Sequence, residues 1–145
     1  MRSVPLLLTL ALLAACAPKE EKPAAETAPP PPPYAAFAGT WATATTIEGV
    51  KDPVQATLTI TADGAGSSMS LEGRPNIALT LSMSGDSLIA TSAEYESVLR
   101  KGVMVTTRSA NVMQGDMMMG SMEATYKTPA GPELVKGTSE SKRAP

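Results

Sequence analysis

A regular alternation of apolar and polar side chains is the feature that most constrains the fold of this chain. Residues 54–62 read VQATLTITA, so valine, alanine, leucine and isoleucine occupy every second position, with glutamine and threonine between them. Successive side chains of a β-strand point to opposite faces of a sheet, and the segment is therefore predicted to be a strand with one apolar face. That face must be buried against other strands.

Seven further segments repeat this pattern and are also predicted to be strands: residues 40–47, 67–72, 77–83, 87–92, 103–112, 117–126 and 133–139. Glycine and aspartate at residues 63–64, 85–86 and 115–116 supply the turns between some of them. Eight short strands at a spacing of about 8–12 residues are typical of an all-β sandwich or barrel.

The short connections favour a meander, in which each strand pairs with the next. The sequence offers no amphipathic helix to cover the apolar face of a sheet, whereas closing the sheet on itself buries that face and removes its edges. We therefore expect an eight-stranded antiparallel up-and-down barrel over residues 35–140, with a two-sheet sandwich as the alternative. Residues 141–145 are polar and are expected to form a frayed tail.

Residues 94–101 make the longest break in the strand pattern and are expected to hold one helical turn. Two interpretations are open for this segment. It is either a plain connector or a cap over one mouth of the barrel, with Val98 and Leu99 packing inward.

The N-terminus has the layout of a secretory signal peptide over residues 1–15. Arg2 precedes an apolar run of roughly ten residues, which is too short to cross a membrane, since a spanning helix needs about 20. The run ends in Leu-Ala-Ala-Cys at residues 13–16, and Cys16 is the only cysteine of the chain. The alternative to a special role for this residue is an ordinary cleaved signal with an incidental cysteine.

Residues 13–16 resemble the lipobox of bacterial lipoproteins. The resemblance implies cleavage before Cys16, a diacylglycerol group on its sulfur and an acyl chain such as palmitate on the new amine. Because Ala17, rather than aspartate, follows the cysteine, the resemblance also implies the outer membrane of a Gram-negative envelope, and we expect the periplasmic face.

Residues 16–34 are predicted to form a lipidated, disordered linker without apolar periodicity. Five consecutive prolines at residues 29–33 predict a stiff polyproline spacer of roughly 15 Å. The main hypothesis is a tether that holds the barrel off the lipid headgroups, and the alternative is a proline-rich ligand for a partner protein.

Composition excludes several classes of function. The chain has no histidine, 12 basic and 14 acidic residues, so neither a zinc site nor a basic surface for nucleic acid is expected. Residues 85–88, Gly-Asp-Ser-Leu, spell the nucleophile block of the GDSL esterases, but the serine would lack a histidine base. We therefore predict a turn there, no enzyme activity and no cofactor. Catalysis by carboxylates, Ser or Tyr alone is the remaining enzymatic hypothesis.

The sequence Phe-Ala-Gly-Thr-Trp at residues 37–41, the meander and a late Arg143 resemble the lipocalin-like (calycin) barrels. In that superfamily an early tryptophan packs across the bottom of the barrel against a late arginine. The resemblance implies such a contact between Trp41 and Arg143.

Methionines are unusually dense in residues 113–122. Met118 and Met122 share one face of the predicted strand and, with Met104 across the hairpin, are expected to fill the core or, together with Trp41, to line a ligand site. Thioethers also suit Cu(I) and Ag(I), so a soft-metal binding protein is the alternative. An apolar contact patch for a partner is a third interpretation.

These observations together predict a non-enzymatic lipoprotein that is held on the membrane by Cys16. It would bind a small apolar ligand or serve as an interaction module of the envelope, with a protein partner that the sequence does not identify.

Overall fold

The structure is a computed structural model that describes residues 29–145. A short 3-10 helix, η1 (Ala35–Phe37), precedes nine strands. The strands are β1 (Gly39–Ile47), β2 (Val54–Ile60), β3 (Ser68–Ser70), β4 (Ile77–Ser84), β5 (Ser87–Ser92), β6 (Tyr95–Glu96), β7 (Met104–Gln114), β8 (Met117–Thr128) and β9 (Gly131–Arg143).

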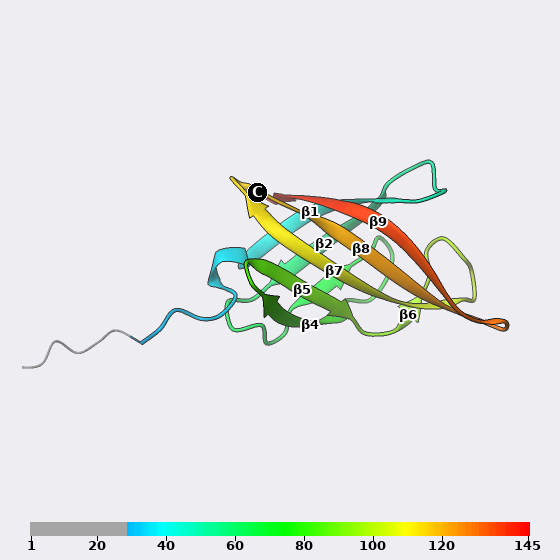
Figure 1. The fold of residues 1–145 in the computed structure, drawn as a ribbon, viewed down its shortest axis with the longest axis horizontal. Coiled ribbons are helices and arrows are strands. Elements are labelled where there is room, and N and C mark those ends of the chain that lie inside the picture. The colour runs from blue at the N-terminus through cyan, green and yellow to red at the C-terminus, as the bar shows by residue number, and fades with distance from the viewer. Residues whose placement is uncertain (1–28) are drawn as a thin grey trace, which may run out of the picture.

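The sheet closes into a barrel (Figure 1). Its strand order is β5-β4-β3-β2-β1-β9-β8-β7-β6, and β5 also pairs with β7. Eight antiparallel strands therefore form the ring, and the two-residue β6 is an additional strand beside β7. The predicted meander barrel is confirmed over the sandwich alternative, and the architecture is compatible with a lipocalin-like fold.

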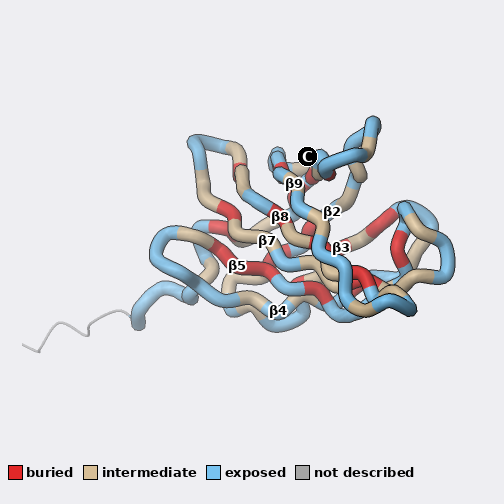
Figure 2. The backbone as a smooth tube through the Cα atoms, turned by 45° about the vertical axis from the view of Figure 1, so that its right-hand side comes forward, coloured by how far each residue is buried: buried red, intermediate tan, exposed pale blue. Residues whose placement is uncertain are grey.

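Period-two burial builds the interior, as Figure 2 shows by the alternation of buried and exposed residues along the strands. In β2, Leu58 and Ile60 are buried while Thr57 and Thr59, on the other face of the strand, are exposed. The buried side chains form two clusters. One surrounds Trp41 and includes Phe37, Leu88 and Met118. The other consists of Ile47, Val105, Met122, Ala124 and Tyr126.

One end of the barrel is closed by Trp41, which is fully buried. Its indole Nε1 donates a hydrogen bond to the Phe37 carbonyl at 2.8 Å, so η1 packs under the ring. The guanidinium of Arg143 lies over the indole ring, as the lipocalin-like resemblance implied.

Two predictions from the sequence are wrong, one of a helical turn and one of a strand end. Residues 94–101 contain no helical turn, because β6 continues the strand pattern and bends follow it. The last strand runs through Arg143 rather than ending near residue 139, and Ser141 is fully buried against β1. Residues 141–143 therefore belong to the barrel and not to a frayed tail.

The predicted signal peptide, Cys16 and most of the predicted linker lie outside the described residues. Residues 29–33 are exposed, and Tyr34 fixes the chain to the barrel because its hydroxyl donates to the Leu81 carbonyl at 2.9 Å. Within residues 29–145, no helix is long and apolar enough to span a membrane.

Candidate functional site

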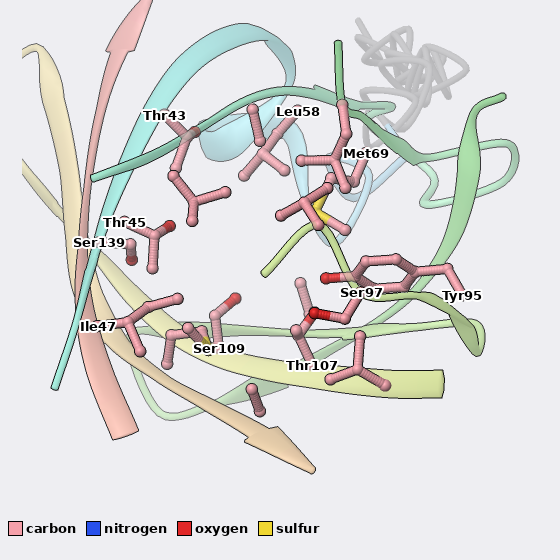
Figure 3. Close-up of a pocket in the computed structure, with 18 of the residues that line it drawn as sticks. Thr43, Thr45, Ile47, Leu58, Met69, Tyr95, Ser97, Thr107, Ser109 and Ser139 are labelled. Atoms are coloured by element: carbon pink, nitrogen blue, oxygen red, sulfur yellow. The ribbon is translucent and has the colours of Figure 1, made fainter. Parts of the chain in front are cut away.

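The barrel encloses a cavity of about 80 Å³ between its two core clusters (Figure 3). A single water needs roughly 10–15 Å³ of such space, whereas a cavity of about 150 Å³ accepts benzene. The interior is therefore hollow but narrow: it holds several waters or a slender group, and a drug-sized ligand does not fit without movement.

One wall of the cavity is apolar. It comes from β2, β3, the residue that follows β3, and β4, and its side chains are Val54, Ala56, Leu58, Met69, Leu71 and Leu79. The inward parity of β2 creates this wall, because the threonines of the same strand face solvent.

The rest of the lining is mixed. β1, β7 and β9 contribute the polar side chains, which form the polar wall: Thr43, Thr45, Thr107, Ser109, Asn111 and Ser139. Apolar side chains of β1, β7 and β8 lie among them: Ile47, Val105, Met122, Ala124 and Tyr126. Asn111 is buried and organises part of this wall: its Nδ2 donates to Ser109 Oγ at 2.8 Å, and Ser139 Oγ donates to its Oδ1 at 3.0 Å.

A glycine makes the Asn111–Ser139 contact possible. These residues lie on β7 and β9, and Gly120 of β8 stands between them in register with both. A Cβ at Gly120 would lie 2.5 Å from Asn111 Oδ1 and would overlap the Ala110 carbonyl oxygen. The missing side chain therefore lets the Asn111 amide reach across β8.

The loop at residues 97–103 lies at the mouth of the cavity. Ser97 is buried, and its Oγ accepts hydrogen bonds from the backbone N–H groups of Leu99 at 3.0 Å and Arg100 at 3.1 Å. This turn places Val98 and Leu99 in the cavity lining, although they remain 43% and 39% exposed. Of the two interpretations of this segment, this position favours the cap over one mouth, but the expected inward packing of Val98 and Leu99 is incomplete.

Two arginines hold this loop in place. Arg100 makes a bidentate ion pair with Glu133, with both N···O distances 2.7 Å, and its guanidinium lies 4.3 Å from the ring centroid of Tyr126. Hydrogen bonding to Arg100 lowers the pKa of Glu133 below its ordinary value, and the same interaction raises the pKa of Arg100. From the other side, Arg74 donates to the Glu96 carbonyl at 2.7 Å.

Tyr95 of β6 points its ring into the cavity (Figure 3). Burial raises the pKa of its phenol above the ordinary value, and hydrogen bonding with the Thr107 side chain offsets part of that rise. The phenol is therefore neutral at physiological pH and can donate a hydrogen bond into the cavity.

The four side chains predicted to line a ligand site do not converge. Met122 lines the cavity, whereas Trp41 and Met118 belong to the packed cluster at the closed end. Met104 immediately precedes the inward Val105 on β7, so its side chain points to the opposite face of the strand.

The polar side chains that β7 turns into the cavity were not predicted from the sequence. Ser109 and Asn111 lie at alternate positions from Val105, and this spacing indicates that they share its inward face. A buried asparagine in a strand is nevertheless hard to foresee without its hydrogen-bond partner Ser139 on β9.

Two observations concern metal binding. Met113 and Met118 are direct partners in the pairing of β7 with β8. Among residues 29–145, no group of three or more His, Cys, Asp or Glu could hold a metal ion.

The Gly-Asp-Ser-Leu block at residues 85–88 lies at a turn, as predicted. Gly85 and Asp86 form the two-residue turn between β4 and β5, and Gly85 has the positive φ of such turns.

Comparison with known protein families gives no match for this chain, and comparison with curated proteins gives none either.

Proposed function

We propose that this chain is a non-enzymatic envelope lipoprotein whose barrel binds a small apolar molecule at its loop-covered end. The observation that carries the proposal is the cavity of about 80 Å³, which opens under a loop whose apolar side chains stay partly exposed. A barrel that served only as a rigid module would gain stability by filling this space, because voids forfeit packing contacts.

The apolar wall supplies the attraction. Each methylene group that moves from water into such a wall contributes about 0.8 kcal/mol. A short alkyl chain of several carbons would therefore bind with an affinity between millimolar and micromolar, after the cost of association is subtracted.

The size of the cavity makes loop movement part of the proposal. Val98 and Leu99 cover the mouth, and the contacts that hold their loop lie at the surface: the ion pair of Arg100 with Glu133 and the hydrogen bond from Arg74 to the Glu96 carbonyl. An exposed ion pair contributes only about 0–1 kcal/mol and an exposed hydrogen bond about 1 kcal/mol, so a ligand can displace the loop at modest cost.

Methionine methyl groups provide reporters for the test. Met69 and Met122 line the cavity, whereas Met118 is buried in the closed end. We expect titration of the intact chain with octanol to shift the methyl resonances of Met69 and Met122 saturably and to leave Met118 unchanged. If no methyl shifts, or if all shift in proportion to the octanol concentration, ligand binding is excluded and the interaction module stands instead.

The tether is the second part of the proposal. The lipobox-like residues 13–16 and the proline-rich segment after them support a barrel that is anchored through Cys16 at the outer membrane. In cells grown with an alkyne analogue of palmitate, the wild-type chain should be labelled and recovered with the membrane. The Cys16→Ser variant should lose the label, and an unlabelled wild-type chain would contradict the lipid anchor.

A further inference from the structure

The described residues that line the cavity carry no charge. They are aliphatic, aromatic, hydroxyl or amide side chains, and none is Asp, Glu, Lys or Arg. The charged pairs of this end, Arg100 with Glu133 and Lys127 with Glu94, lie outside the lining. An ionised group brought into the cavity would lose its hydration without gaining a counter-charge, which is strongly unfavourable.

The cavity is nevertheless not uniformly apolar. The aliphatic wall of β2, β3 and β4 faces hydroxyl groups of β7 across the interior, as the close-up shows for Leu58 and Met69 against Thr107 and Ser109 (Figure 3). The hydroxyl side chains of β1, Thr43 and Thr45, lie beside the aliphatic wall, because β1 pairs with β2. A purely hydrocarbon ligand would cover hydroxyl groups that it cannot bond to, at the cost of their hydration.

The polar wall has hydrogen-bonding capacity to offer. Ser109 Oγ accepts from the Asn111 amide and keeps its own O–H as a donor, and Ser139 Oγ donates to Asn111 and keeps lone pairs as acceptors. Because Asn111 holds both hydroxyls in place, a donor and an acceptor lie on one wall in a fixed arrangement. The Tyr95 phenol adds a neutral donor on the side of the mouth.

We infer that the cavity selects neutral amphiphiles: a short aliphatic chain that bears one uncharged hydroxyl, amide or ester group, in preference to carboxylates and amines of the same chain length. The aliphatic chain lies along β2, β3 and β4, and the polar group bonds to the wall around Asn111. This inference depends on the proposed ligand binding and specifies its chemistry.

The test compares four ligands with the same alkyl chain: octanol, octanamide, octanoate and octylammonium. With the Met69 and Met122 methyl resonances as reporters, the two neutral compounds should bind at least about tenfold more tightly than either ion, because only the ions leave a buried charge without a partner. If octanoate or octylammonium binds as tightly as octanol, the selection is overturned while ligand binding stands. If none of the four binds, the proposed function fails.

A variant pair tests the polar wall itself. Ser109→Ala removes the free hydroxyl, and Ser121→Ala, an exposed position on β8, is the matched control. Ser109→Ala should weaken octanol binding about three- to tenfold, the usual worth of one hydrogen bond, and should leave the binding of chlorooctane, which has no hydroxyl, unchanged. Equal weakening of both ligands, or weakening by neither variant, would overturn the role of the wall.

A second substitution covers the case in which Ser109→Ala disturbs Asn111. Thr45→Val keeps the shape of the side chain and removes another hydroxyl of the same wall, and Thr46→Val, on the exposed face of β1, is its control. The same difference between octanol and chlorooctane is expected. If neither Ser109→Ala nor Thr45→Val weakens octanol binding more than chlorooctane binding, the inference is overturned.

Discussion

Arg143 and Trp41 are direct partners in the pairing of β1 with β9, and the guanidinium of Arg143 lies 4.4 Å from the centroid of the indole ring. The same guanidinium donates through Nη1 to the Ala38 carbonyl at 2.8 Å. Gly39 makes room for it, because a Cβ at this position would lie 2.7 Å from Nη1. The first and last strands of the barrel are therefore joined by one side chain at the closed end.

Replacing Arg143 with alanine removes this contact. A cation–π interaction of this kind contributes about 0.5–2 kcal/mol, and the hydrogen bond to Ala38 contributes about 1 kcal/mol more. We expect Arg143→Ala to lower the free energy of unfolding by about 1–3 kcal/mol, measured by urea denaturation with Trp41 fluorescence as the probe. Lys142→Ala, at an exposed position beside it, should change the stability by less than about 0.5 kcal/mol. Equal effects of the two variants would contradict the role of Arg143.

Gly120 should tolerate no side chain. A Cβ there meets the Ala110 carbonyl and the Asn111 amide, so Gly120→Ala must displace either the β7 backbone or the Asn111 side chain. Forcing atoms into a packed interior costs about 1–3 kcal/mol, and we expect a loss of that size in the free energy of unfolding. Ser121→Ala, at the adjacent exposed position, is the control, and a Gly120→Ala variant as stable as this control would show that the strand adapts freely.

Acid should release the loop over the cavity. Arg100 lowers the pKa of Glu133, so the ionised carboxylate stabilises the folded loop above the ordinary pKa of glutamate, and this contribution is lost as the pH falls through the lowered value. We expect the Val98 and Leu99 methyl groups to gain mobility, measured by NMR relaxation, as the pH is lowered from neutral to about pH 3.

A substitution separates this ion pair from general acid effects. Glu133→Gln should raise the mobility of the loop at neutral pH by a small amount, in keeping with an exposed ion pair, and should lose most of the pH response. Glu140→Gln, which affects a distant exposed pair with Lys142, should behave as the wild type. A pH response that persists unchanged in Glu133→Gln would assign the effect to another group.

The methionines should differ in their rates of oxidation. Met83 is 40% exposed, whereas Met118 is fully buried. Peroxide reaches a thioether only where it is accessible, so we expect Met83 to be oxidised first and Met118 last, followed by peptide mass spectrometry. In urea the two rates should become equal. Rapid oxidation of Met118 in the folded chain would contradict its place in the closed end.

The alternation of side chains predicted most of the fold correctly, because a half-buried strand constrains its own sequence at every second position. The positions of the eight barrel strands, the turns at Gly85 and Gly115 and the inward face of Met118 and Met122 follow from that local pattern. The expected inward position of Met104 is wrong. The strand pattern is interrupted before β7, so the sequence does not show which alternate residues of β7 face the interior, and the structure turns Val105 inward instead.

The sequence alone thus determined that this chain forms antiparallel strands with one apolar face and that the sheet must close, since nothing else covers that face. Only the tertiary structure decided how completely the interior is filled, which hydroxyls face the cavity and which arginines hold the loop over its mouth. These properties depend on pairings between distant residues, such as Asn111 with Ser139 and Arg100 with Glu133, and a local periodic pattern carries no information about the partner across the barrel.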